Sequence, residues 1–437
     1  MTQATHSIPL PRSKSTGSSS WRKSFSALSV PNFRIFAGAN VLAMTATWMQ
    51  RVAQDWLVLQ LTGSVAAVGV TVAMQFGPML LFGLYGGVIV DRYPKRILLM
   101  ITQGGVGLLS LLLSVLVLTN TVAVWEVWAM AFVVGLLTIV DNPARQVFAS
   151  ELVGPERLRN AVTINSAIFQ LGGLIGPAVS GILLVAVGGG FAFGLNALAC
   201  FVTVVALTRL DRSALHPMPA APRERGQLKE GLGYVKAKPT ILWPIVLVGF
   251  LAVFALTMPV LLAAYANTVF HAGAGGYGLF TSLVAIGAFT GALLSTRRQV
   301  LRLRTVVISG GVWAAVQALA AVMPNEFTFG LVLVASGIAN QFFFMAANPL
   351  IQMSSSIRLR GRVMAVWILV LLGGQGIGGP VMGGIVDAVG PQAGMLLSGL
   401  VPAVAAVVIS LVLARRGQLR LTVERMLPIP ALRIAHR

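Results

Sequence analysis

Two pairs of opposite charges lie inside long apolar runs of this sequence. Arg51 precedes Asp55 by four residues, and Asp141 precedes Arg145 by the same interval. On a helix this spacing puts the two side chains on one face, one turn apart, where they can form an ion pair. Charges are costly to bury in apolar surroundings, and a buried pair that takes up a proton or exchanges its partner can couple two events. All four residues are therefore candidates for coupling, and the alternative is a structural or gating pair.

Neutral amide side chains in the same apolar runs form a second group of candidates. An amide inside an apolar bundle can face a cavity and bind a ligand, or it can hydrogen-bond to a neighbouring helix. Both interpretations stay open for the four amides that we select as candidates for lining a cavity: Gln54, Gln75, Asn165 and Asn340.

A charged turn, DRYPKR at 91–96, separates two of the apolar runs. Asp91 is the only acid of this turn, and it lies where the first run ends. If that run is a helix, the carboxylate can meet the positive N-terminus of a neighbouring helix. A glycine one turn earlier and three basic residues accompany it: Gly87, Arg92, Lys95 and Arg96.

The composition indicates that these residues belong to a membrane protein. Hydrophobic residues make up 56% of the 437 residues, charged residues only 10%, and the mean hydropathy is +0.84. Many apolar runs reach the roughly 20 residues that cross a bilayer as a helix, and they do not alternate as the strands of a β-barrel do. We expect an all-α membrane protein embedded in the lipid bilayer.

The basic residues are distributed unevenly along the chain. All but one of the 32 Lys and Arg lie in or close to the two tails and every second connection, and Arg51 is the exception. This positive-inside distribution predicts a plasma-membrane protein with both termini in the cytoplasm. It also explains the net charge of +20 without nucleic acid as a partner. Two acids at segment ends, Glu126 and Asp387, are expected at the membrane interface.

We count twelve apolar segments, at about 32–58, 66–90, 97–119, 123–149, 159–186, 190–208, 241–266, 275–296, 305–323, 327–350, 362–388 and 391–414. They predict two six-helix bundles, at 32–208 and 241–414, and two cytoplasmic tails, a disordered one at 1–31 and a basic one at 415–437. The bundles are joined by a cytoplasmic linker at 209–240. Within it, Leu228, Leu232 and Val235 share one helical face, which predicts an amphipathic helix at the membrane surface.

The two bundles repeat each other in sequence. Asn142-Pro143 in segment four matches Asn348-Pro349 in segment ten. Arg159 precedes Gly176-Pro177 by seventeen residues, and Arg362 precedes Gly379-Pro380 by the same number. Two six-helix halves in parallel repeat are typical of transporters in which the substrate path lies between the halves.

With these motifs the chain resembles the major facilitator superfamily. GVIVDRYPKR (87–96) resembles its loop 2–3 signature, and GGLIGPAVSG (172–181) resembles the segment-five signature of its exporters and antiporters. More narrowly, three stretches resemble the enterobactin-exporter-like, or transmembrane secretion effector, branch: WMQRVAQDWLVLQLTGS (48–64), NPARQVFASELV (142–153) and RLRNAVTINSAIF (157–169).

The resemblance implies alternating access by rocking of the two halves, with Asp91 as a latch that locks the cytoplasmic side through segment eleven. Gly87, Arg92, Lys95 and Arg96 complete this latch, although Lys95 stands where the family usually has Arg and Pro94 where it has Gly. The segment-five signature implies antiporter-type helix packing, for which a generic small-residue contact is the alternative. The residues concerned are Gly172, Gly176, Pro177, Gly181, Gly379 and Pro380.

These observations predict a secondary active efflux transporter, acting as a monomer by proton antiport. The few charges in the apolar segments favour a small lipophilic or amphipathic cargo, such as a drug or a siderophore-like metabolite. The sequence has no Walker loop and no His/Cys cluster with metal-ligand spacing, so we expect no enzyme, no metal and no cofactor, with the proton gradient as the energy source. A passive facilitator (uniporter) and an importer on the same fold remain alternatives.

Overall fold

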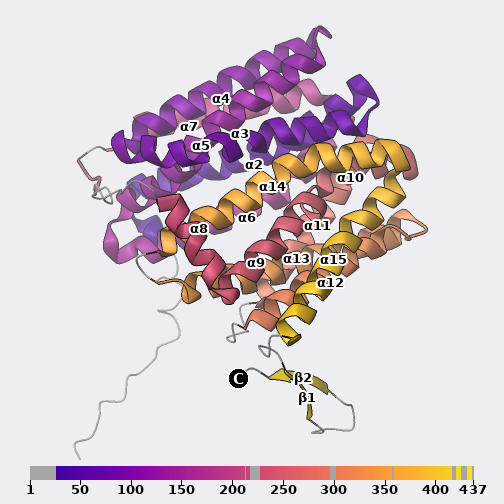
Figure 1. Ribbon diagram of the computed structural model, residues 1–437. Coiled ribbons are helices and arrows are strands. Elements are labelled where there is room, and N and C mark those ends of the chain that lie inside the picture. The colour runs from indigo at the N-terminus through magenta and orange to yellow at the C-terminus, as the bar shows by residue number, and fades with distance from the viewer. Residues whose placement is uncertain are drawn as a thin grey trace, which may run out of the picture.

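The computed structural model describes residues 26–211, 213–216, 227–295, 302–356, 359–415, 420–424 and 431–435. Most of the tail predicted at 1–31 and part of the linker predicted at 209–240 lie outside these residues. Where the chain is described, it is built almost entirely of long helices (Figure 1).

Six long helices form the first half: α2 (Pro31–Thr62), α3 (Val65–Arg92), α4 (Lys95–Leu118), α5 (Val124–Val153), α6 (Leu158–Ala186) and α7 (Gly189–Thr208). Short 3-10 turns precede α2 and α6, namely η1 (Ser26–Ser29) and η2 (Pro155–Arg157). The connections are tight. Gly63 takes the left-handed conformation (φ 66°) that ends α2, and the Ser64 hydroxyl then caps α3 by accepting a hydrogen bond from the Ala67 amide at 3.2 Å.

The second half begins with an interrupted helix. Its pieces are α9 (Pro239–Phe250), the π turn η3 (Leu251–Ala255), α10 (Met258–Ala264) and the π turn η4 (Tyr265–Val269). Pro259 has no amide hydrogen and cannot continue the helical ladder from α9 into α10. Five continuous helices follow: α11 (Gly273–Ser295), α12 (Leu303–Ala320), α13 (Glu326–Ser354), α14 (Arg360–Val389) and α15 (Pro391–Arg415).

Two smaller elements lie outside the membrane helices. The helix α8 (Gln227–Ala237) connects the halves; its Val235 is buried in the core of the second half, whereas Leu232 is 45% exposed. After α15, β1 (Arg420–Glu424) and β2 (Ala431–Ala435) pair as an antiparallel hairpin with Arg420 opposite Ala435. The sequence did not predict this hairpin in the basic tail.

The predicted architecture of twelve membrane helices in two six-helix halves is confirmed. Within the described residues, eleven spans are long and apolar enough to cross a membrane. The twelfth is α2, a 32-residue helix that packs along α6 and α7. The mean hydropathy of α2 is lower than that of the other membrane helices because α2 contains Arg51, Asp55 and several amides.

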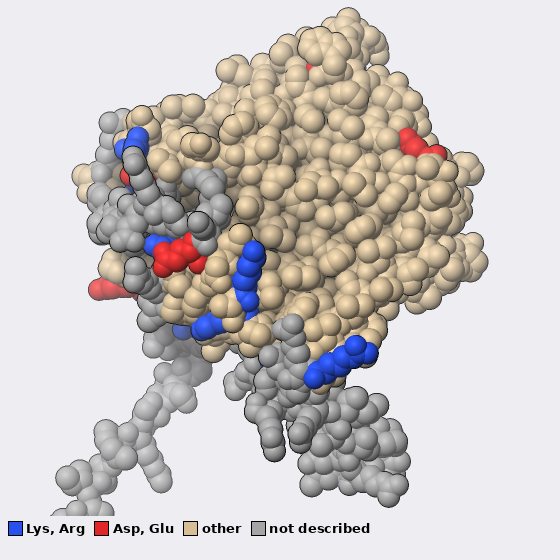
Figure 2. All heavy atoms as spheres, viewed as in Figure 1, with Lys and Arg blue, Asp and Glu red and all other residues tan. Residues whose placement is uncertain are grey.

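The two ends of the molecule differ in charge and in packing. One end, here called the basic end, carries α8 and the turns α3–α4, α5–α6 and α13–α14, and Lys and Arg gather there (Figure 2). The other, here called the opposite end, carries the turns α2–α3, α4–α5, α6–α7 and α14–α15. At the opposite end a single hydrophobic core joins both halves, whereas at the basic end each half has its own core. The halves are therefore closed against each other at the opposite end.

Candidate functional site

The most extensive contacts between the halves are made by two helix pairs, α3 with α14 and α6 with α11. Both contacts depend on glycine. A side chain on Gly69 or on Gly379 would collide with the backbone of the other residue. A Cβ on Gly181 would lie 2.9 Å from the Cα of Gly278, too close for any side chain. Of the packing residues predicted from the sequence, Gly181 and Gly379 thus lie at the boundary between the halves.

The neighbouring prolines lie at the same boundary. The Pro177 carbonyl is next to Gly278, and the Pro380 nitrogen is next to Gly69. Gly172 and Gly176 have a different place, because they seat α6 against α2 within the first half. A Cβ on Gly172 would lie 2.9 Å from the Met44 Cβ.

A carboxylate closes the opposite end between α14 and α3. Asp387 accepts hydrogen bonds from the Ser64 hydroxyl (2.7 Å) and from the amides of Val65 (3.0 Å) and Ala66 (3.1 Å). These amides belong to the first turn of α3, where a negative charge is favourable. Asp387 lies at a membrane end, as expected, and it also holds the two halves together.

Asp55 makes a second polar contact across the halves. It lies on α2 with 4% exposure, and its Oδ2 accepts a hydrogen bond from the Tyr277 hydroxyl of α11 at 3.2 Å. The Tyr277 ring stacks on Trp56 with centroids 5.9 Å apart. Gln75 of α3 donates to the Asp55 Oδ1 at 3.4 Å. Asp55 therefore bonds to partners in both halves.

Arg51 does not form the ion pair with Asp55 that the spacing allows. Among the described residues no hydrogen bond or ion pair reaches the Arg51 guanidinium. Its central carbon instead lies 5.1 Å from the ring centroids of both Trp48 and Phe76. These cation–π contacts hold the half-buried guanidinium between α2 and α3.

A small, partly open cavity of about 40 Å³ lies beside Arg51, inside the first half. Gln54 and Gln75, predicted as lining residues, both line it, and Gln75 donates to the Gln54 Oε1 at 3.3 Å. Arg51 is the only charged residue in its wall within the described part of the chain. The uncharged polar lining residues are Thr47, Gln50, Gln54, Gln75, Thr138 and Asn196.

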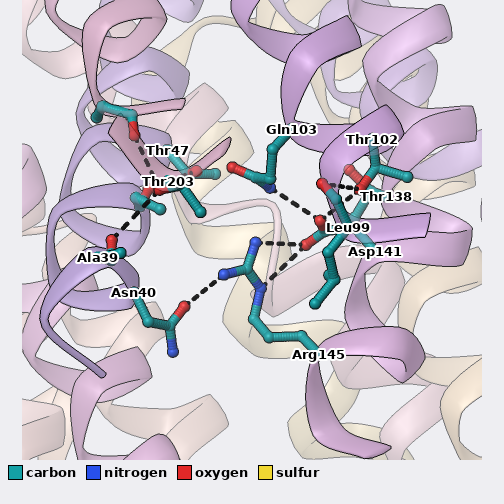
Figure 3. Close-up of polar contacts among 12 residues, drawn as sticks. Ala39, Asn40, Thr47, Leu99, Thr102, Gln103, Thr138, Asp141, Arg145 and Thr203 are labelled. Carbon is teal, nitrogen blue, oxygen red and sulfur yellow. Dashed lines mark hydrogen bonds and ion pairs between the residues drawn. The ribbon is translucent and has the colours of Figure 1, made fainter. Parts of the chain in front are cut away.

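Asp141 and Arg145 form the ion pair that their spacing predicts (Figure 3). Arg145 donates to the Asp141 Oδ2 through Nη2 at 2.8 Å and through Nε at 3.1 Å. The second carboxylate oxygen accepts from Thr102 and Gln103, both at 2.8 Å. Arg145 also donates to Asn40 at 2.6 Å. Every partner belongs to the first half, so this buried network ties α2, α4 and α5 together.

The two asparagines predicted as lining residues lie elsewhere. Asn165 of α6 accepts a hydrogen bond from Asn40 at 2.7 Å and so extends the Arg145 network. Asn340 is a half-buried residue of α13. Neither lines the cavity beside Arg51.

The predicted latch residues lie at the basic end. Asp91 is partly exposed at the end of α3, Arg92 is exposed and Gly87 is half-buried. Lys95 pairs with Glu151 of α5 at 3.6 Å, and Arg96 donates to the carbonyl of Leu207 at 2.7 Å. These two basic residues thus bind to α5 and α7 of their own half.

The first turn of α14 has a carboxylate partner at the basic end. Arg362 of that turn pairs with Glu230 of α8. The tethering of α8 is extended by Tyr234, whose hydroxyl accepts a hydrogen bond from the Ser356 amide at 3.1 Å. A hydrogen bond from Lys238 lowers the pKa of the Tyr234 phenol. In this conformation α8 is fastened to the second half.

Sequence reasoning missed Tyr277, Trp48 and Phe76. No local signal marks them, because each is an aromatic residue in an apolar segment, where packing is the ordinary role. Their importance depends on the charged residues of other helix faces that they meet.

Comparison with known proteins points to transporters. A family model described as transmembrane secretion effector matches residues 22–434. The enterobactin exporter EntS of Salmonella typhi is 27% identical over 412 residues, covering 92% of this chain and 97% of that protein. EntS of Escherichia coli O1:K1 is 27% identical over 414 residues, with the same coverage.

Solved structures show the same fold at low identity. The nucleoside transporter NupG matches with a TM-score of 0.68 and 12% identity, over 87% of this chain and 98% of that one. A bacterial homologue of the human lysosomal transporter Spinster, in an inward-facing and unoccupied conformation, matches with a TM-score of 0.63 and 16% identity, over 88% and 96%. These likenesses concern the fold alone.

Proposed function

This chain belongs to the transmembrane secretion effector family of major facilitator transporters, and from that premise we propose that it exports a small lipophilic or amphipathic molecule in exchange for protons. It is a multi-pass membrane transporter and not an enzyme. The positive-inside rule assigns the basic end and both termini to the cytoplasm. We place the protein in the plasma membrane. The conformation closed at the opposite end is then the one that accepts cargo from the cytoplasm.

The observation that carries the proposal is the hydrogen bond between Asp55 and Tyr277. It joins a buried carboxylate of the first half to a hydroxyl of the second, at the closed end. A hydrogen bond to an ionised carboxylate is roughly twice as strong as one between neutral groups. A proton arriving at Asp55 therefore weakens the contact that keeps the opposite end closed.

This contact suits an antiporter. The ionised Asp55 holds the empty carrier shut at the opposite end, so that the empty carrier does not cycle and dissipate the gradient. Two events release it: cargo binding that displaces Gln75, which also bonds to Asp55, or a proton binding to Asp55. The proton gradient supplies the energy, and neither a cofactor nor a second copy of the chain is needed.

Enterobactin is the first cargo to test, because the curated relatives are named as its exporters. Everted membrane vesicles containing the full chain are acidified inside, and enterobactin uptake is measured with and without a proton uncoupler. We expect uptake that the uncoupler abolishes. Asp55→Asn should abolish proton-driven accumulation and retain counterflow, the exchange of labelled for unlabelled cargo at equilibrium.

Asp141→Asn is the matched comparison, at equal amounts of folded protein. Its carboxylate is also buried in the first half, but all its partners lie in that half. If Asp141→Asn lost proton coupling and Asp55→Asn kept it, Asp141 and not Asp55 would be the residue that binds the proton. Counterflow without uphill accumulation in the unaltered chain would establish a passive facilitator, and accumulation in the reverse direction an importer.

A further inference from the structure

We propose that the small cavity beside Arg51 binds a cluster of water molecules that carries protons to and from Asp55, and that Gln75 is the gate between this water and the carboxylate. The inference deepens the proposed function and rests on it. It assigns a ligand, water, to the cavity and a positioning residue to the proton exchange.

The size and lining of the cavity suit water. One buried water molecule needs at least about 10–15 Å³ and two to four polar partners, so a volume of about 40 Å³ has room for about two or three. Hydroxyls and amides of α2, α3, α5 and α7 line the cavity. It is too small for a cargo molecule.

Two residues of the cavity wall have polar groups that call for opposite kinds of partner. The Arg51 guanidinium carries only N–H donors, and its described contacts are the rings of Trp48 and Phe76. The Oδ1 of Asn196, a residue that is 1% exposed, is an acceptor without a hydrogen-bond partner in the described part of the chain. Water donates and accepts, so it serves both groups, whereas an anion would serve only Arg51 and a cation only Asn196.

The cavity lies on the side of Asp55 that faces the basic end. The helix α2 begins at the basic end and ends at the opposite end. Thr47, in the cavity wall, precedes Asp55 by eight residues, or about 12 Å along this helix. Water in the cavity therefore covers part of the distance between Asp55 and the cytoplasm.

Gln75 separates this water from Asp55. It lines the cavity, and its Nε2 donates to the Asp55 Oδ1 at 3.4 Å and to the Gln54 Oε1 at 3.3 Å. Both bonds are long, so they hold the amide weakly. An amide N–H donates a hydrogen bond but does not give up its proton, so proton exchange at Oδ1 requires Gln75 to move aside.

The two oxygens of Asp55 then have different tasks. Oδ2 accepts from Tyr277 of the second half, and Oδ1 faces the gate. Arg51, one turn earlier on α2, is the other ionisable neighbour of this carboxylate among the described residues. Cargo binding that displaces Gln75 admits water to Oδ1, so that cargo binding and proton exchange occur together.

The test records infrared difference spectra of the purified full chain in detergent between low and high pH, in ordinary water and in water labelled with oxygen-18. Bound water next to a group that changes its charge gives O–H stretching bands that shift with the isotope. We expect such bands, together with a protonated-carboxyl band that Asp55→Asn removes. Spectra without isotope-sensitive water bands would overturn the inference.

Filling the cavity locates the water. The double variant Val106→Ile, Val134→Ile adds one methylene at each of two lining positions and leaves every polar group in place. It should remove the water bands and slow the response of the carboxyl band to a pH jump by at least about tenfold. Val133→Ile is the matched control, since Val133 is 40% exposed and does not line the cavity. Water bands that persist in the double variant would contradict their assignment to this cavity.

Gln75→Ala tests the gate. Without the amide, water should reach Asp55 in the absence of cargo, and the carboxyl band should respond at least about tenfold faster. Gln103→Ala is the matched control, because Gln103 donates to the Asp141 Oδ1 at 2.8 Å and does not line the cavity. An equal or slower response in Gln75→Ala would rule out Gln75 as the gate.

The spectra are independent of transport, so the two proposals fail separately. Water bands and an Asp55 band without proton-driven export would refute the proposed function and leave the water route standing. Proton-driven export without water bands would refute the water route alone.

Discussion

The Asp387 carboxylate of α14 accepts a hydrogen bond from Ser64, the N-cap residue of α3, at 2.7 Å across the two halves. The helices α3 and α14 pack antiparallel, with Gly69 against Gly379 and Gly77 against Gly376, and α14 ends beside the start of α3. Each also ends in a carboxylate, with Asp387 in the last turn of α14 and Asp91 in the last turn of α3. The pair thus carries one acid near each end: Asp387 bonds across the halves at the opposite end, and we predict that Asp91 does so at the basic end.

Asp387→Asn should shift the molecule toward opening at the opposite end. The variant loses the charge on the first turn of α3 and weakens three hydrogen bonds, at a cost of about 1–3 kcal/mol. Maleimide labelling of a reporter, Val72→Cys, should become about five to a hundred times faster, since Val72 is 5% exposed beside Gly379. The native Cys200, 1% exposed, provides a slow background.

Glu126→Gln is the control for this experiment. Glu126 also lies at the opposite end, but its carboxylate accepts from the Ala123 amide at 2.9 Å within its own helix start. The Glu126→Gln variant should therefore leave the labelling rate of Val72→Cys unchanged. If Val72→Cys were labelled at the same rate with Asp387→Asn as without it, Asp387 would not be what keeps the opposite end closed.

The buried network of Asp141 and Arg145 should behave as a structural unit. Arg145→Gln leaves the Asp141 charge without its counter-ion, and breaking a buried pair in this way costs about 3–5 kcal/mol. The double variant Asp141→Asn, Arg145→Gln should cost clearly less than the sum of the two single variants. Thermal unfolding in detergent measures the series. Additive losses would show that the two side chains do not act on each other.

The sequence predicted contacts within a helix or between repeated motifs better than contacts between distant helices. Asp141 and Arg145 pair as their spacing predicts, and Gly181 and Gly379 lie at the boundary that the repeated motifs indicate. Arg51 and Asp55 have the same spacing and do not pair. Their own helix allows the pair, but Tyr277 and Trp48 provide competing partners.

The reason is that helical periodicity specifies only which side chains share a face. Tyr277 is 222 residues from Asp55 in sequence, and Ser64 is 323 from Asp387. Which residues of the other half stand opposite depends on how the halves are tilted, and this changes during an alternating-access cycle. Sequence patterns therefore locate the charged residues and leave their partners open.

Gly278→Ala should force the halves apart at the opposite end. The new methyl would collide with the Gly181 backbone, which cannot give way as a flexible side chain can. Labelling of Val72→Cys should rise, as in Asp387→Asn. Gly104→Ala is the control, because nothing lies within 4 Å of the added methyl and alanine favours the helix. If Val72→Cys labelling stayed slow in Gly278→Ala, the contact between α6 and α11 would accommodate the methyl group without opening the opposite end.

Asp91→Asn tests the other end of the same helix pair. If Asp91 closes the basic end on the first turn of α14, its loss should destabilise the conformation that is open at the opposite end. Labelling of Val72→Cys should then fall or stay low, and transport should slow while folding is retained.

The double variant Asp91→Asn, Asp387→Asn distinguishes a balance of two closing contacts from two unrelated defects. Each loss destabilises a different conformation, so the equilibrium should return toward that of the unaltered chain, with labelling between the values of the single variants. Faster labelling in Asp91→Asn alone would contradict the arrangement, because it would place Asp91 among the residues that hold the opposite end closed.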